Sequence, residues 1–286
     1  MNMKIKLLLL PLLTFLVTSF KAAKEPAPQK TSNNLNISLL LDLSDRIDPH
    51  KYPDLYQRDL QYIKFVQKAF TNHIKGKKII QLKDQMQVFF DPAPQNPTIN
   101  ALSQQLKVNF NKQSSKNEIN NIEKTFSEIP AKIYQSAIKD KTFIGSDIWR
   151  FFKNNVKDYC IKDNHRNILI IITDGYMFHQ NSKFTEKNKS SYITPSFIQS
   201  KKLTNSNYKN LIEKNRLGFI PATDNLQDLE IVVLGINPSK KNPYENDVIN
   251  QYWSDWFKAM NVRKFYLKNT DLATNLEPII LKIISG

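Results

Sequence analysis

Three long apolar runs stand out along the chain, separated by segments in which apolar and polar residues are mixed. The runs lie at 36–43, 166–175 and 229–236, and the first two contain the sequences LLLDL and IIITDG. Near-continuous apolar runs of this length are typical of strands covered on both faces, as in a parallel sheet. The pattern therefore predicts three buried central strands.

The segments between and after these runs repeat apolar residues at helical spacing. After Pro53, one face of a predicted helix carries Leu55, Leu60, Ile63, Val66, Phe70 and Ile74. Further helices are expected near 97–107, 116–138, 145–159, 244–260 and 272–285, and further strands at 263–267 and, as a pair, within 77–91. Ser146 is the expected capping residue of the helix over 145–159. Strands that alternate with helices predict an α/β fold, with a doubly wound, mostly parallel central sheet flanked by helices.

Composition divides the chain into an export signal at 1–23, a polar linker at 24–35 and one domain at 36–286. The domain contains a polar insert at about 176–228. Lys4 and Lys6 precede an apolar stretch that is too short to span a bilayer comfortably. We expect removal of roughly the first twenty residues, with an uncleaved anchor as the alternative. The expected location is extracytoplasmic, either periplasmic or secreted.

The single cysteine and the charge balance narrow the classes of protein. Cys160 lies far from the signal, so the chain is not expected to be a lipoprotein, and an internal disulfide framework is excluded. The formal net charge is +15, of which the lysines of 1–23 supply three, and a basic chain favours an anionic surface or polymer as partner. Lysine and asparagine are spread along the whole chain without a dense basic run, which argues against a nucleic-acid role.

Oxygen-bearing side chains follow the first two apolar runs. Asp42 and Asp174 stand at the carboxyl ends of two predicted central strands. In a doubly wound sheet ligands bind outside the carboxyl ends of the strands, at the switch in strand order, so these aspartates are expected to meet there. The loops DLSDR, GSDI and TDG, at 42–46, 145–148 and 173–175, together offer carboxylate and hydroxyl oxygens.

These loops resemble those of the von Willebrand factor A-type (vWA) domain, with its metal-ion-dependent adhesion site (MIDAS). In that family the first strand ends in an Asp-x-Ser-x-Ser loop, a second loop supplies a threonine, and a later strand ends in aspartate. Asp42 and Ser44 match the first two positions, Ser146 stands where threonine is common, and Asp174 matches the last position. The resemblance runs from about residue 36 to the C-terminus.

The resemblance implies a binding or adhesion module that takes a protein partner. The implied metal ligands are Asp42, Ser44, Ser146 and Asp174, and the flanking residues are Asp45, Arg46, Asp147, Thr173 and His179. Carboxylate and hydroxyl oxygens suit Mg²⁺ or Mn²⁺. In the family, an acidic group of the partner fills the open coordination position.

Arg46 departs from the family pattern, because it occupies the position of the second serine. A guanidinium cannot ligate a cation and repels one at short range. Two arrangements follow. With a metal bound, Arg46 turns outward toward Asp45, Asp48 or a carboxylate of the partner. Without a metal, Arg46 supplies the positive charge itself and fixes the loops as an ion-pair network among the carboxylates of Asp42, Asp147 and Asp174.

Rival functions use the same residues. An extracytoplasmic, metal-dependent hydrolase built on this oxygen cluster is the competing class, and an accessory subunit of an envelope or secretion assembly is the third. A haloacid-dehalogenase-like phosphatase would need a second aspartate at Ser44. The histidines show no metal-ligand spacing, and a P-loop and a dinucleotide fingerprint are absent. We therefore interpret the chain as a binding module and not an enzyme.

Two groups of aromatic residues receive different interpretations. Tyr252, Trp253, Trp256 and Phe257 have the spacing of a helix face that packs on the sheet. The insert carries Tyr176, Phe178, Phe184, Tyr192, Phe197 and Tyr208 among lysines and asparagines. A long loop beside the ligand-facing edge is often functional, so we expect the insert to contribute partner contacts. On this interpretation, a short linker in its place leaves a folded domain with impaired binding.

Overall fold

Six strands form the central sheet of the described residues, which in this computed structural model are 34–286 without 142 and 144. The strands are β1 (Leu35–Leu41), β2 (Gln85–Phe89), β3 (Lys107–Asn109), β4 (Arg166–Ile172), β8 (Leu229–Ile236) and β9 (Lys264–Asn269). Their order is β3-β2-β1-β4-β8-β9, and every neighbouring pair is parallel except β2 with β3. The predicted α/β, doubly wound, mostly parallel sheet is confirmed. The expected export signal and nearly all of the linker lie outside the described residues.

The switch in strand order lies between β1 and β4. The chain runs outward from β1 to β2 and β3, returns to β4 on the other side of β1, and continues outward to β8 and β9. Once the strands of the insert are left out, this is the order of a doubly wound nucleotide-binding sheet. The carboxyl ends of β1 and β4 therefore meet at the place where such folds bind ligands.

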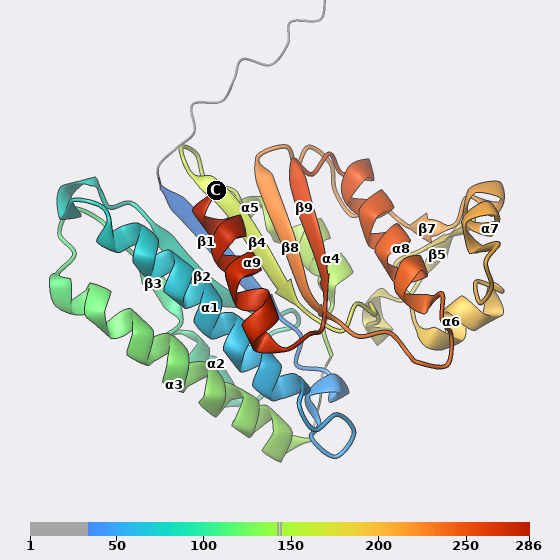
Figure 1. The fold of residues 1–286 in the computed structure, drawn as a ribbon, viewed down its shortest axis with the longest axis horizontal. Coiled ribbons are helices and arrows are strands. Elements are labelled where there is room, and N and C mark those ends of the chain that lie inside the picture. The colour runs from blue at the N-terminus through green and yellow to red at the C-terminus, as the bar shows by residue number, and fades with distance from the viewer. Residues whose placement is uncertain (1–33, 142, 144) are drawn as a thin grey trace, which may run out of the picture. The chain divides into compact units, whose positions relative to one another are not determined.

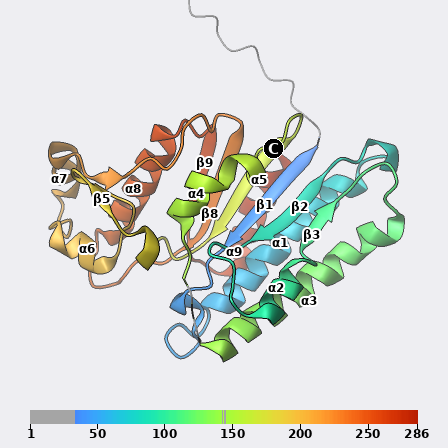
Figure 2. The same cartoon turned by 180° about the vertical axis from the view of Figure 1, so that it is seen from behind.

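Helices cover both faces of the sheet. One face carries α1 (Leu55–Lys75), α2 (Pro97–Ser103), α3 (Lys116–Asp140) and α9 (Ala273–Ser285), of which α1, α3 and α9 lie in front in Figure 1. The other face carries α4 (Ile148–Asn154), α5 (Val156–Cys160) and α8 (Glu245–Ala259), with α4 and α5 in front in Figure 2. Burial on both faces explains why β1, β4 and β8 are apolar at nearly every position.

Each face of the sheet has its own hydrophobic core. Neighbouring residues of a strand point to opposite faces, so Leu39 of β1 packs in the core beneath α1 while Leu40 packs in the core beneath α8. The α8 core contains the aromatic side chains of Tyr252, Trp253, Trp256 and Phe257, all buried as predicted. Cys160 is fully buried in the same core, and burial raises the pKa of its thiol to about 12, which confirms its expected role as a small apolar residue.

Several predicted boundaries are wrong, and each has a physical reason. The first strand expected within 77–91 is a 3-10 turn at Ile79–Gln81 in which Ile80 is exposed, and among the described residues no strand pairs with it. The helix expected over 97–107 ends at Ser103, and the chain then pairs with β2 as β3, so tertiary pairing overrides local propensity. Leu35, assigned to the linker, begins β1.

The helix predicted over 145–159 also differs. Its N-cap is Asp147 instead of Ser146, and the side chain of Asp147 accepts a hydrogen bond from the Arg150 amide at 3.0 Å. The helix is divided at Asn155 into α4 and α5, since the φ of that residue is −124°. Asp147 therefore has a local structural role that the sequence assigned to its neighbour.

The insert is an ordered structure and not a polar loop. It contains a 3-10 turn at Gln180–Ser182 followed by β5 (Thr185–Glu186), β6 (Lys189–Ser190), α6 (Pro195–Ser200), α7 (Tyr208–Asn215) and β7 (Gly218–Phe219). β5, β6 and β7 form a small sheet of their own. The indoles of Trp149 and Trp256 both donate hydrogen bonds to the Ile220 carbonyl at 2.9 Å, which joins the insert to α4 and α8. Among the helices described, none combines the length and the apolar character needed to cross a membrane.

Candidate functional site at the carboxyl edge of the sheet

Asp42 and Asp174 follow neighbouring strands and therefore lie side by side. β1 and β4 pair up to Leu41 and Ile172, and the Asp42 amide then donates to the Ile172 carbonyl at 3.1 Å. The carboxylate of Asp42 is buried and accepts two hydrogen bonds, from the Thr173 hydroxyl at 2.9 Å and from the Ser44 amide at 2.9 Å. Thr173, predicted to flank the site, thus orients the carboxylate of Asp42.

Asp174 comes one residue after Thr173 and is partly exposed. Its carboxylate accepts a hydrogen bond from the Tyr176 amide at 3.1 Å. Burial and then the negative charge of Asp42 raise the pKa of Asp174 to about 7. Gly175 permits the sharp exit from β4, because its φ is +93° and a Cβ would lie 3.0 Å from Ile249 Cγ2. The two carboxyl groups are therefore close enough for the charge of one to disfavour ionisation of the other.

The two predicted serine ligands lie on different loops. Ser44 comes two residues after Asp42, and its side chain is partly exposed and does not cap the following turn. Ser146 belongs to the loop before α4, which is held at the end of β2 by a hydrogen bond of 2.6 Å from the Asp147 amide to the Asp91 carbonyl. Ser146 is buried, and its hydroxyl has no hydrogen-bond partner in the part of the chain that the structure describes. All of the predicted ligands lie at the carboxyl edge, and their role as metal ligands stays a prediction.

Arg46 lies near Asp42 and Asp174, as the arrangement without a metal predicts, but its ion pair is with a residue outside the expected set. Its side chain is buried and forms a bidentate ion pair with Asp59 of α1, with nitrogen–oxygen distances of 2.6 and 3.0 Å. Tyr134 of α3 donates a third hydrogen bond to the same carboxylate at 2.9 Å. Burial alone would lower the pKa of Arg46, but the charge and hydrogen bonds of Asp59, together with the charges of Asp42 and Asp174, outweigh burial and raise it. Asp45, by contrast, is exposed and pairs with Lys51.

Asp59 is a neighbour of the candidate site that the sequence interpretation missed. It lies four residues before Ile63 and seven before Val66, on the apolar stripe of α1. A carboxylate on a buried helix face needs a buried partner. The position of Asp59 on the apolar face of α1 could therefore have indicated a buried ion pair, and the structure shows that Arg46 is its partner.

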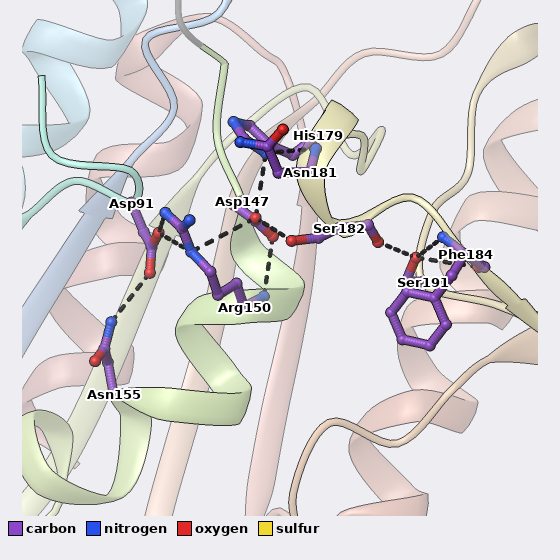
Figure 3. Close-up of polar contacts among 9 residues, drawn as sticks. All are labelled: Asp91, Asp147, Arg150, Asn155, His179, Asn181, Ser182, Phe184 and Ser191. Atoms are coloured by element: carbon purple, nitrogen blue, oxygen red, sulfur yellow. Dashed lines mark hydrogen bonds and ion pairs between the residues drawn. The ribbon is translucent and has the colours of Figure 1, made fainter. Parts of the chain in front are cut away.

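A second polar cluster surrounds Asp147 and joins the Ser146 loop to the insert (Figure 3). The carboxylate of Asp147 accepts a hydrogen bond from the Ser182 hydroxyl, and His179 Nδ1 lies 3.3 Å from the same oxygen. Arg150 bridges Asp147 and Asp91, with its Nε 3.6 Å from Asp147 and 2.9 Å from Asp91. Ser182 and His179 both contact one carboxylate oxygen, so the imidazole does not stand between a hydroxyl and a carboxylate as in a catalytic triad. His179 lines this cluster and not the Asp174 corner.

An open groove of about 1050 Å³ begins at Asp174. One wall consists of the segment before α1 and the first turn of α1, including Lys51 and Arg58, and the other consists of α6 and the β8–α8 loop with Lys240 and Lys241. Glu245 at its edge is buried and accepts a hydrogen bond of 2.6 Å from the Tyr176 hydroxyl. Basic residues therefore line a groove that the Asp174 carboxylate also lines.

Comparisons with known proteins bear on the fold. No family model matches this chain, and no curated protein matches it. Solved structures similar to it include proximal thread matrix protein 1 from the mussel byssus, at 13% identity and a TM-score of 0.34, and the pilus adhesin SpaC from Lactobacillus rhamnosus GG, at 10% and 0.39. A third is an aerotolerance-related membrane protein from Bacteroides fragilis, at 11% and 0.38.

The matches differ in coverage. The match to the mussel protein spans 88% of this chain and 46% of that chain. The match to the Lactobacillus adhesin spans 90% of this chain and 30% of that one, and the match to the Bacteroides protein spans 88% and 99%. This chain therefore covers less than half of the length of the first two. Likenesses of this extent carry no functional information. The doubly wound topology and the strand-end positions of Asp42 and Asp174 are those that the vWA resemblance implies.

Proposed function

We propose that the chain is a vWA-like binding module that recognises an acidic group of a protein partner at the carboxyl edge of its sheet, through a divalent cation. The observation that carries the proposal is the pair of carboxylates, Asp42 and Asp174, held side by side at the switch in strand order. The groove that begins at Asp174 gives a partner access to this corner. Asp42, Ser44, Ser146 and Asp174 would hold the cation.

The charges of this corner fit a divalent cation in spite of Arg46. The bidentate contact with Asp59 offsets the charge of Arg46, since each group carries one unit of opposite sign. A bound cation would displace the proton that the raised pKa of Asp174 favours, and Asp42 and Asp174 would then supply two negative charges, the number that Mg²⁺ or Mn²⁺ balances. The Ser146 hydroxyl is a buried oxygen without a protein partner among the described residues, which is consistent with a ligand role. A bound cation would supply a Lewis-acidic position for the partner's carboxylate.

Titration with MnCl₂, followed by calorimetry and by thermal unfolding, tests the metal. We expect wild type to bind, and Asp174→Ala and Ser146→Ala to bind at least tenfold more weakly. At about 100 times the dissociation constant the metal adds about 2.7 kcal/mol of stability. In a domain of this size that raises Tm by about 5–11 °C.

Asp45→Ala is the matched control, because this carboxylate belongs to the same loop but points to solvent and pairs with Lys51. It should bind Mn²⁺ like wild type. Circular dichroism without metal checks that every variant is folded. Absence of binding by wild type, or equal loss in Asp45→Ala, contradicts a cation site at Asp42 and Asp174.

The proposed role is binding and not catalysis. Turnover of generic ester or phosphate substrates by wild type, with loss of turnover in Asp174→Ala, would instead assign the cluster to a hydrolase. The geometry around Asp147 favours the binding role, because the Ser182 hydroxyl donates to the carboxylate of Asp147 and the His179 imidazole contacts that same carboxylate instead of accepting the hydroxyl proton as a general base would.

A further inference from the structure

The insert carries an open pocket whose walls are aromatic. It has a volume of about 540 Å³, and the rings of Phe178, Tyr192 and Phe197 line it. Phe178 meets Tyr192 edge to face with 6.3 Å between ring centroids, and Tyr192 meets Phe197 in the same way at 5.2 Å. Phe197 is buried, but 41% of Phe178 is exposed. Folding of the insert therefore leaves part of this aromatic surface in contact with solvent, where it can receive a ligand group.

Two lysines lie over these rings and determine the charge of a suitable ligand. Lys183 Nζ lies 5.6 Å from the ring centroids of both Phe178 and Tyr192, and Lys201 Nζ lies 5.6 Å from that of Phe197. Aromatic rings attract cations, but here the ammonium groups of Lys183 and Lys201 already lie over the rings. A cationic ligand would be repelled by them, whereas an aromatic group next to a carboxylate would gain contacts with both the rings and the lysines.

The aromatic pocket adjoins the groove that begins at Asp174. Ser196, in the first turn of α6, lines both cavities. Lys240 and Lys241 are exposed on the far wall of the groove, so basic residues border the groove as well as the pocket. A single extended segment that crosses the start of α6 would contact both cavities.

We propose that the aromatic pocket binds an aromatic side chain of the same acidic partner segment whose carboxylate reaches Asp174. This inference rests on the proposed function and specifies the partner as a peptide with an acidic residue at the groove and an aromatic residue, accompanied by a second acidic residue, at the pocket. Two contacts on one segment give an affinity above that of either contact, provided that the spacing in the peptide matches the two cavities.

A phage-displayed library of random dodecapeptides, selected on the folded protein in MgCl₂, is the probe. We expect enriched sequences that combine an acidic residue with an aromatic residue at a fixed spacing. The affinity of a labelled, enriched peptide is then measured by fluorescence polarisation. Phe178→Ala should weaken binding about tenfold, as expected for an aromatic contact at the centre of an interface, and Lys183→Ala should weaken it less.

The chain offers matched controls in the same segment. Phe184 is 39% exposed, nearly as much as Phe178, but its ring packs edge to face on Trp149 at 4.9 Å and lines no part of the pocket. Phe184→Ala and Lys187→Ala should bind like wild type. Replacing the aromatic residue of the peptide by alanine should weaken binding to wild type but change binding to Phe178→Ala little, because that contact is already lost.

The outcomes separate this inference from the proposed function. Failure to enrich peptides, enrichment of peptides without an aromatic residue, or equal binding by wild type and Phe178→Ala overturns the pocket. If Asp174→Ala abolishes peptide binding while Phe178→Ala does not, the result supports the proposed site at Asp174 and contradicts a role of the aromatic pocket. If Phe178→Ala weakens binding while Asp174→Ala does not, the pocket acts alone and the proposed function falls.

Discussion

Replacement of Asp59 by asparagine tests whether this residue offsets the buried charge of Arg46. The substitution keeps the size of the side chain and an acceptor for the Tyr134 hydroxyl, but it removes the negative charge. The side chains of Arg46 and Asp59 are only 2% and 1% exposed, so water cannot replace the lost partner. Removal of one member of a buried ion pair costs about 3–5 kcal/mol, because the other charge stays buried without compensation. In a domain of this size that lowers Tm by about 6–20 °C.

The double variant Arg46→Met/Asp59→Asn separates charge from packing. It removes both charges, fills the space of the arginine stem, and leaves Tyr134 its acceptor. Since an apolar replacement of a buried ion pair is often nearly neutral, the free energy of unfolding should return to within about 2 kcal/mol of wild type. Asp54→Asn is the surface control: this residue lies 3.9 Å from Arg58, its side chain is 69% exposed, and we expect a loss below about 0.5 kcal/mol.

Urea unfolding, followed by the fluorescence of the buried Trp253 and Trp256, measures these differences. The same variants also test the link to the metal. Asp59→Asn adds an uncompensated positive charge beside Asp42 and should weaken Mn²⁺ binding, whereas the double variant should bind like wild type. A loss below about 1 kcal/mol in Asp59→Asn, or a double variant no more stable than the single one, refutes the compensation of Arg46 by Asp59.

Two further predictions concern stability. Burial alone would raise the pKa of Asp84, but hydrogen bonds from His73, Lys77 and the Leu35 amide lower it. The stabilising effect of Asp84 is therefore present above the unfolded pKa of about 3.9 and is lost as the pH falls through the lower folded pKa. Acid titration of the unfolding free energy should show a shallower decline below pH of about 4 in Asp84→Asn than in wild type. Replacement of 176–228 by a short linker should abolish cooperative thermal unfolding, because the insert supplies the Ile220 carbonyl to two indoles and many residues to the α8 core. A deletion variant that is folded and melts cooperatively would contradict this prediction.

The second of these predictions reverses an expectation drawn from the sequence. The insert was expected to be a polar loop that a linker could replace, because its apolar residues are scattered among lysines and asparagines without a clear period. In the structure these scattered residues, among them Ile193, Ile198 and Phe219, are buried against α4 and α8. Strands of two residues and helices of six to eight residues are too short to leave a periodic pattern.

The central sheet could be predicted because its environment leaves a strong signal. β1, β4 and β8 are buried on both faces, which requires apolar residues at nearly every position. The parallel arrangement then fixes the common edge at which Asp42 and Asp174 end their strands. β3 left no such signal: it has three residues, only partial burial, and a position that depends on pairing with β2.

The sequence could not predict the partner of Arg46, and the reason affects the interpretation of the motif. A departure from an Asp-x-Ser-x-Ser pattern to arginine implies the loss of a cation site only if the arginine charge stays in that site. Here α1 contributes Asp59 from its apolar face, so the charge introduced by the loop is offset by the helix beneath it. The guanidinium lies between the strand ends and α1 and donates a hydrogen bond to the Asp42 carbonyl at 3.4 Å, while Asp174 lines the groove. A motif substitution of this kind should therefore be interpreted together with the charged residues on the buried faces of adjacent helices, because those residues decide the net charge of the site.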